Sequence, residues 1–116
     1  MPLNHVALTV GDVARSAAFY AEHFGLTERV HADEHLTILG SPAGGVLALS
    51  SGGEVPAAGL PRTNHFGFQV ARDEVLAARE RFRAAGVTET EWQDDGKFTR
   101  VQVADPDGYR VELYAF

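Results

Sequence analysis

The chain contains no cysteine among its 116 residues. Disulfide bonds, thiolate catalysis and cysteine-ligated zinc are therefore excluded for these residues. Positively charged residues are also few. The chain has ten Lys and Arg and sixteen Asp and Glu, so its net charge is −6. This balance disfavours a nucleic-acid partner, since that kind of binding depends largely on neutralising phosphates.

Long apolar runs are missing as well. No segment approaches the ~20 consecutive apolar residues that a membrane helix needs. The first residues, MPLNHV, lack the basic and apolar regions of a signal peptide. We therefore expect a cytoplasmic protein with no membrane partner, and the length fits a single domain.

The sequence does contain an approximate internal repeat. The segment LNHVALTV recurs later as TNHFGFQV, so an Asn-His pair occurs at 4–5 and again at 64–65. Toward the end of each copy, SPAGGVLAL corresponds to DPDGYRVEL. These motifs recur in the same order, with the extra residues falling in loops and turns, where insertions are tolerated. The chain is therefore interpreted as two copies of one module.

Each copy is predicted to contain a strand, a helix and three further strands. Alternation of apolar and polar residues indicates the strands, and apolar residues at helical spacing indicate the helices. Asp12 and Asp73 are the expected N-caps, and Gly25 and Gly86 the expected helix ends. The predicted strands are 4–10, 26–31, 35–40, 45–51, 64–70, 87–92, 98–104 and 109–116, and the helices are 11–25 and 72–86.

The expected fold class is α+β. Two βαβββ modules, 1–52 and 63–116, would form a curved mixed sheet around a shared cavity. The segment 53–62, rich in Gly, Pro and Ala, is the expected linker.

The repeat also predicts a metal site. His5 and His65 begin equivalent strands, so the two imidazoles are expected to face each other across the shared cavity. The last strand of the second copy contributes Glu112, and the same alignment places Ala48 at the equivalent position of the first copy. Two histidines and one carboxylate form a ligand set that leaves open positions on a first-row divalent ion.

These motifs, together with FYAEHFGL in the first helix, resemble those of the vicinal oxygen chelate superfamily. Its members include glyoxalase I, methylmalonyl-CoA epimerase, extradiol dioxygenases, fosfomycin-resistance thiol transferases and bleomycin-type antibiotic-binding proteins. The resemblance implies that His5, His65 and Glu112 bind a divalent ion (Fe, Mn, Ni, Co or Zn). It also implies a homodimer in which each site takes ligands from both chains.

Departures from the family patterns narrow the range of reactions that we expect this chain to catalyse. Ala48 replaces the glutamate that the isomerases use as ligand or base, and a methyl group cannot move a proton. Gln102 stands where the extradiol dioxygenases and the fosfomycin enzymes have a tyrosine. Ala7 replaces a threonine of the fosfomycin enzymes, and Arg100 is the best remaining cation for a phosphonate. Fosfomycin modification is therefore disfavoured.

Two functions remain open. The first is a metal-dependent enzyme acting on a small molecule with adjacent oxygens, by lyase, transferase or dioxygenase chemistry rather than isomerisation. The alternative is a metal-free protein that sequesters an antibiotic or other natural product, for which the acidic balance and Trp92 allow a groove. The predicted substrate-binding residues are Phe98, Arg100, Gln102, Tyr114 and Ala48. HADEH, at 31–35, is interpreted as a hairpin tip rather than a second metal cluster.

Overall fold

The computed structural model describes residues 1–56 and 59–116, which form two compact units, Met1–Pro56 and Ala57–Phe116. Residues 57–58 belong to the predicted linker and lie outside the described residues. Each unit is described separately below.

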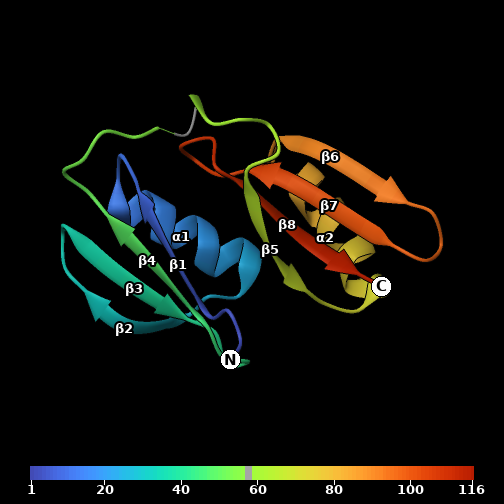
Figure 1. The fold of residues 1–116 in the computed structure, drawn as a ribbon, viewed down its shortest axis with the longest axis horizontal. Coiled ribbons are helices and arrows are strands. Elements are labelled where there is room, and N and C mark those ends of the chain that lie inside the picture. The colour runs from blue at the N-terminus through green and yellow to red at the C-terminus, as the bar shows by residue number, and fades with distance from the viewer. Residues whose placement is uncertain (57–58) are drawn as a thin grey trace. The chain divides into compact units, whose positions relative to one another are not determined.

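The first unit is a four-stranded sheet with one helix (Figure 1). The strand order is β1-β4-β3-β2, with β1 parallel to β4 and the other neighbours antiparallel. The helix packs against β3 and β4. The elements are β1 (His5–Thr9), α1 (Val13–Phe24), β2 (Glu28–Ala32), β3 (Leu36–Gly40) and β4 (Val46–Ser50).

The second unit has the same topology. Its strand order is β5-β8-β7-β6, β5 is parallel to β8, and the helix packs against β7 and β8. Its elements are β5 (His65–Gln69), α2 (Arg72–Ala84), β6 (Glu89–Asp94), β7 (Thr99–Ala104) and β8 (Arg110–Ala115). The α+β class and the two βαβββ modules are thus confirmed, and each module builds its own mixed sheet. The cavity shared by the modules stays a prediction.

The internal repeat extends to strand register. In the first unit Ala48 is the Cα partner of Ala7 on one side and Ile38 on the other. In the second unit Glu112 has Gly67 and Gln102 as its partners. The edge strands β2 and β6 each shift register against their neighbours, β3 and β7. The shifts lie at equivalent places, between Arg29 and His31 in β2 and between Glu89 and Glu91 in β6. Ala48 and Glu112 therefore occupy equivalent positions, as the sequence alignment predicted.

One face of each sheet is apolar and is covered by its helix. Val13, Ala17 and Tyr20 recur at helical spacing on α1 and are buried. Val75, Ala78 and Phe82 do the same on α2. Alternate strand residues meet these helix faces, because successive side chains of a strand point to opposite sides. The buried strand residues include Leu39, Leu47, Leu49, Val101, Val103, Val111 and Leu113.

The helix ends agree with the prediction except at one cap. The Asp12 carboxylate accepts a hydrogen bond from Arg15 N at 3.0 Å, and Gly25 ends α1 with a φ of 69°. The prediction of Asp73 as the second N-cap was wrong. Ala71 holds that place in an extended conformation with no side-chain cap, and Asp73 lies in the first turn.

The first helical hydrogen bonds of α2 show where the helix begins. Ala71 O accepts from Glu74 N at 3.0 Å and from Val75 N at 3.2 Å, so the helical conformation already includes Arg72. Asp73 still favours the helix from its first turn, where a negative charge meets the positive end of the helix dipole.

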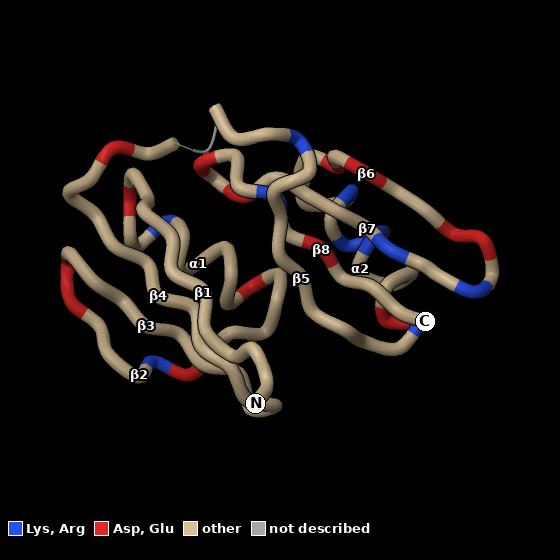
Figure 2. Tube along the Cα trace, in the orientation of Figure 1, with Lys and Arg blue, Asp and Glu red and all other residues tan. Residues whose placement is uncertain are grey.

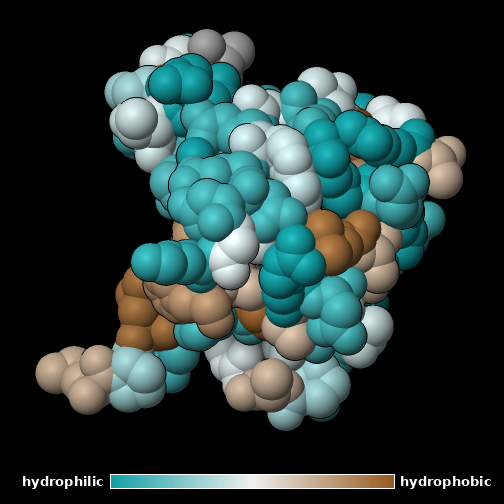
Figure 3. All heavy atoms as spheres, turned by 90° about the vertical axis from the view of Figure 1, so that its right-hand side faces the viewer, coloured by the Kyte–Doolittle hydropathy of each residue, from teal (hydrophilic) through white to brown (hydrophobic). Residues whose placement is uncertain are grey.

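None of the described helices is long and apolar enough to span a membrane. Apolar side chains reach the surface as separate patches among hydrophilic ones (Figure 3).

The two N-caps give a matched stability test. Asp12→Ala should lower the free energy of unfolding by about 1 kcal/mol, because Arg15 N loses its acceptor. Ala71→Ser should raise it by about 1 kcal/mol, because α2 gains a side-chain acceptor. Urea unfolding followed by circular dichroism measures both changes. Equal stability of Ala71→Ser and the parent would contradict the assignment of Ala71 as the N-cap.

Candidate functional site

The sheet face of the second unit that lies away from α2 carries the predicted ligands. His65 lies at the start of β5, and Glu112 lies on the adjacent strand β8 opposite Gly67. Residues two apart on a strand share a face, so His65, Gly67 and Glu112 project to the same side of the sheet. The structure therefore brings together two of the three predicted metal ligands.

Glu112 is a buried carboxylate held at both of its oxygens. Its side chain is only 9% exposed. Oε1 lies 3.2 Å from His65 Nε2, and Oε2 accepts a hydrogen bond of 3.1 Å from Arg100 Nη1. A buried charge without partners would be strongly destabilising, so these two contacts account for its presence inside an apolar strand.

The orientation of the His65 ring is set by a backbone carbonyl. Nδ1 lies 2.8 Å from Thr63 O, and a carbonyl oxygen only accepts, so Nδ1 carries the proton. In the neutral imidazole, Nε2 then presents a lone pair toward Glu112 Oε1, which is also an acceptor. Two acceptors 3.2 Å apart require a proton or a cation close to both. A ring fixed through its second nitrogen in this way is the usual arrangement of metal-binding histidines, so these residues fit a metal ion.

Arg100 extends the contact into a row of alternating charges. Arg62 pairs with Glu91 at 2.8 Å, Glu91 with Arg100 at 2.5 Å, and Arg100 with Glu112. Glu91 lies on β6, Arg100 on β7 and Glu112 on β8, and Figure 2 shows acidic positions on β6 and a basic position on β7. Burial lowers the pKa of the Arg100 guanidinium, but the hydrogen bond to Glu112 and the neighbouring carboxylates outweigh burial and raise this pKa above its ordinary value. Arg100 therefore stays positively charged and restrains Glu112.

Gly67 makes room for the Glu112 side chain. A Cβ atom at this position would lie 2.6 Å from Glu112 Cγ and 2.9 Å from Glu112 O. Both distances are too short for real contacts, so the carboxylate lies over β5 only because residue 67 has no side chain. In the first unit the equivalent pair is Ala7 beside Ala48, where two methyl groups replace the glycine and the carboxylate.

The pair His65–Glu112 lies in an open cavity of about 480 Å³. Three aromatic side chains form one side of it. The ring centroids of Phe98 and Tyr114 are 6.3 Å apart, those of Phe98 and Phe116 are 5.4 Å apart, and those of Tyr114 and Phe116 are 5.6 Å apart. The lining residues are His65, Phe66, Gly67, Phe98, Glu112, Tyr114 and Phe116.

The other predicted site residues are distributed as follows. Phe98 and Tyr114 line the cavity, whereas Arg100 contacts Glu112 from beside it. Gln102 is 1% exposed, and its Oε1 accepts a hydrogen bond from Thr90 Oγ1 at 2.9 Å. His5 and Ala48 belong to the first unit, on the neighbouring strands β1 and β4. In the residues that the structure describes, no cluster of three or more His, Asp or Glu side chains gathers to hold a metal.

Gly67, Glu91 and Phe116 were not identified from the sequence. Gly67 did leave a signal, because an isolated glycine within a strand pattern often marks a close approach of neighbouring atoms. No such signal marked Glu91 or Phe116, because the contacts of these residues depend on which strands are neighbours. Trp92 lies on the other face of the sheet, where its Cα partner is the buried Val101 and the Arg79 guanidinium lies 4.0 Å from the ring centroid. It therefore does not contribute to this cavity.

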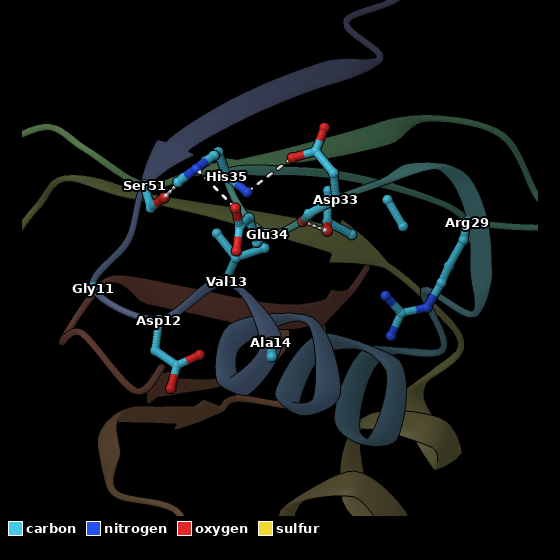
Figure 4. A pocket seen from close by; sticks show the side chains of 11 residues that line it. Gly11, Asp12, Val13, Ala14, Arg29, Asp33, Glu34, His35 and Ser51 are labelled. Carbon is cyan, nitrogen blue, oxygen red and sulfur yellow. Dashed lines mark hydrogen bonds and ion pairs between the residues drawn. The ribbon is translucent and has the colours of Figure 1, made fainter.

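The HADEH segment forms the tip of the β2–β3 hairpin, as predicted. Asp33 organises this tip: Oδ1 accepts hydrogen bonds of 2.8 Å from His35 N and Leu36 N, and Oδ2 lies 2.8 Å from His31 Nε2. Asp33, Glu34, His35 and Ser51 line a pocket of the first unit, shown in Figure 4. There His35 Nε2 lies 3.3 Å from Glu34 Oε1, and His35 Nδ1 lies 3.4 Å from Ser51 Oγ. The hydrogen bond with His31, followed by those from the backbone, lowers the pKa of Asp33 to about 2.

Acid should weaken the first unit through Asp33. Its pKa is lower in the folded state than its ordinary value of 3.8, so the stabilisation is complete above pH 4 and is lost as the pH falls toward 2. Asp33→Asn should therefore flatten the dependence of unfolding free energy on pH between pH 5 and 2, as measured by urea unfolding. An unchanged slope in the variant would contradict this assignment.

Gly67→Ala should disturb the Glu112 carboxylate. The added methyl group collides with Glu112, so we expect a loss of about 1–3 kcal/mol in unfolding free energy. The double variant Gly67→Ala/Glu112→Ala reproduces the Ala7–Ala48 pair of the first unit and serves as the matched control.

A double-mutant cycle from urea unfolding measures the coupling between Gly67 and Glu112. Adding Glu112→Ala should recover part of the stability lost in Gly67→Ala, because it removes the Cγ atom that the new methyl group meets. Strict additivity of the two single changes would show that the close approach does not determine the cost.

Comparison with known proteins identifies the family of the chain. The family model for the Glyoxalase/Bleomycin resistance protein/Dioxygenase superfamily matches residues 2–113. The chain is 30% identical to the glutathione transferase FosA of Serratia marcescens, over 97% of this chain and 79% of that protein.

Three solved structures show the same fold. The fosfomycin resistance protein FosX of Listeria monocytogenes matches with a TM-score of 0.81 and 26% identity, over 100% of this chain and 93% of that one. A further FosX structure, 25% identical with a TM-score of 0.81 over 98% of this chain and 89% of that one, was determined with Mn(II) and sulfate. A possible glyoxalase from Bacillus cereus matches with a TM-score of 0.80 and 27% identity, over 97% of both chains. The chain belongs to the glyoxalase/bleomycin resistance protein/dioxygenase superfamily, whose members are also known as vicinal oxygen chelate proteins.

Proposed function

We propose that this protein is a divalent-metal-dependent enzyme in which His65 and Glu112 provide two of the three protein ligands. The observation that carries the proposal is the convergence of His65 Nε2 and Glu112 Oε1, two atoms able to bind a metal ion, at 3.2 Å from each other. The His65 ring is fixed by Thr63 O and the carboxylate by Arg100, so both groups are oriented before a metal arrives.

The proposed third ligand is His5. It occupies in β1 the place that His65 occupies in β5, at the start of the strand that runs parallel to the last strand of its unit. We propose that His5 of this chain or of the other chain of a homodimer completes the site. The FosX structure with Mn(II) supports a metal of this kind, and Fe, Ni, Co and Zn share the same ligand preferences.

When bound, the metal ion would act as a Lewis acid toward adjacent oxygens of a small substrate. The chain itself holds the site in shape: Arg100 restrains one oxygen of Glu112, and Gly67 leaves the space in which the carboxylate lies. The proposed substrate contacts are Phe98 and Tyr114, which line the cavity, and Arg100, Gln102 and Ala48. Arg100 and Gln102 lie on β7 outside the cavity lining, and Ala48 belongs to the first unit.

The reaction class is narrowed by what the first unit lacks. Ala48 occupies the position equivalent to Glu112, and its methyl group cannot serve as a ligand or as a proton-transfer base. Lyase, transferase or dioxygenase chemistry is therefore proposed in preference to isomerisation. The 30% identity to a glutathione transferase, FosA, supports the transferase option and a role in antibiotic resistance.

A metal-free binding protein is the second candidate. It is favoured by one observation: Arg100 already neutralises Glu112, so the carboxylate has a cationic partner without a metal. In that case the open aromatic cavity would hold an antibiotic or another natural product without chemistry.

Metal content separates the two candidates. Protein purified without chelator should carry near-stoichiometric divalent metal, and His5→Ala, His65→Ala and Glu112→Ala should each lose most of it, because each removes one of three protein ligands. Inductively coupled plasma mass spectrometry gives the metal content, and Mn(II) titration followed by electron paramagnetic resonance gives the affinity.

His31→Ala is the matched control, because His31 lies on the exposed hairpin tip beside Asp33. Its metal content should equal that of the parent. A metal-free parent with no measurable Mn(II) affinity would overturn the enzyme proposal and leave the binding protein. Loss of metal in His65→Ala and Glu112→Ala but not in His5→Ala would remove His5 from the ligand set.

A further inference from the structure

Three aromatic residues, Phe98, Tyr114 and Phe116, form a continuous group that we call the aromatic cluster. Its three ring-centroid distances lie between 5.4 and 6.3 Å, which is the range of contacting aromatic pairs. Phe98 directly precedes β7, Tyr114 lies near the end of β8, and Phe116 directly follows β8. The antiparallel pairing of these two strands brings the three rings together.

The aromatic cluster is open to a ligand. Phe116 is 83% exposed, and Phe98 and Tyr114 are half-buried. All three rings line the same cavity as His65 and Glu112. The cavity thus has a polar end suited to a metal ion and an apolar end made of flat rings.

Positive charge is missing from this cavity. In the part of the chain that the structure describes, its lining contains no Lys or Arg. Arg100, the cation beside it, donates from Nη1 to Glu112 and from Nε to Gln93 Oε1 at 3.4 Å, while Nη2 pairs with Glu91. An anionic tail such as a phosphonate would therefore meet no available cation, and it would have to compete with two carboxylates for Arg100.

We propose that the substrate carries a flat apolar group, such as an aryl ring, which stacks on the aromatic cluster while its adjacent oxygens point toward His65 and Glu112. The oxygen end rests on the proposed metal-dependent function, whereas the apolar end rests on the aromatic cluster alone. Phe98, Tyr114 and Phe116 are then the residues that select the substrate, and Arg100 is a positioning residue for Glu112.

Two α-hydroxy acids test this selection. Mandelate and lactate share the same adjacent oxygens and the same charge, and they differ by a phenyl in place of a methyl group. Mandelate should bind the Mn(II)-loaded protein at least about tenfold more tightly than lactate. Even partial burial of the phenyl group against the aromatic cluster is enough to raise the affinity by this factor. Isothermal titration calorimetry measures both dissociation constants.

The variants Phe98→Ala and Phe116→Ala should reduce the preference for mandelate to about twofold or less, since each removes part of the apolar surface. Their affinity for lactate should stay that of the parent, because lactate has no ring to stack. Phe19→Ala is the matched control: it removes an aromatic ring that contacts Tyr20 and His23 on α1 in the first unit, and it should leave the preference unchanged.

A metal-independent measurement separates this inference from the proposed function. In metal-free protein, 4-methylphenol should shift the NMR resonances of the Phe98, Tyr114 and Phe116 rings. If the protein binds no metal but these shifts appear, the metal-dependent function fails and the aromatic cluster stands as a ligand site.

Three results would overturn the inference. They are equal affinities for mandelate and lactate in Mn(II)-loaded protein, tighter binding of fosfomycin than of mandelate, and no shift of the three rings with 4-methylphenol. Conversion of a dimer to a monomer by Phe116→Ala, with the preference for mandelate intact, would likewise assign Phe116 to a contact between chains instead.

Discussion

The buried Glu112 carboxylate is the constraint on which the rest of the second unit depends. A charge at 9% side-chain exposure must have partners, and the structure provides Arg100 at one oxygen and His65 at the other. Arg100 in turn needs Glu91, and Glu91 also pairs with Arg62. Gly67 is required on the neighbouring strand because any side chain there would meet Glu112. One acidic residue thus constrains residues on three other strands, β5, β6 and β7, and on the loop that carries Arg62.

The repeat shows what the fold looks like without that charge. Both units use the same strand order, the same parallel pairing and the same register shift on the edge strand. In the first unit the position of Glu112 is taken by Ala48, and its neighbours are the apolar Ala7 and Ile38. The scaffold therefore tolerates either an apolar or a charged set at these positions. Under the proposed function, this asymmetry between the units leaves one carboxylate, Glu112, as a metal ligand and no second carboxylate at the equivalent Ala48.

Local patterns were sufficient to predict the elements, because alternation and helical spacing follow directly from backbone geometry. The strands, both helices and the Asp12 and Gly25 caps were predicted from these patterns. The error at Asp73 arose because Ala71 O accepts the first helical hydrogen bonds of α2 although Ala71 has no capping side chain, so the preference of Asp for N-caps gave the wrong residue. Gln102 is a different case: its alternation with Arg100 was visible, but its bond to Thr90 depends on the neighbouring strand β6.

The sequence alone predicted the two βαβββ modules from its internal repeat, and its motifs resembled those of the family to which the chain belongs. It also predicted His5, His65 and Glu112 as metal ligands, of which the structure brings His65 and Glu112 together. Only the tertiary structure decided that Gly67 lies beneath Glu112, that Arg100 is held between two glutamates, and that Phe116 joins Phe98 and Tyr114. Each of these contacts joins residues on different strands. Register and strand order bring such residues together, and neither can be derived from the spacing of residues along one strand.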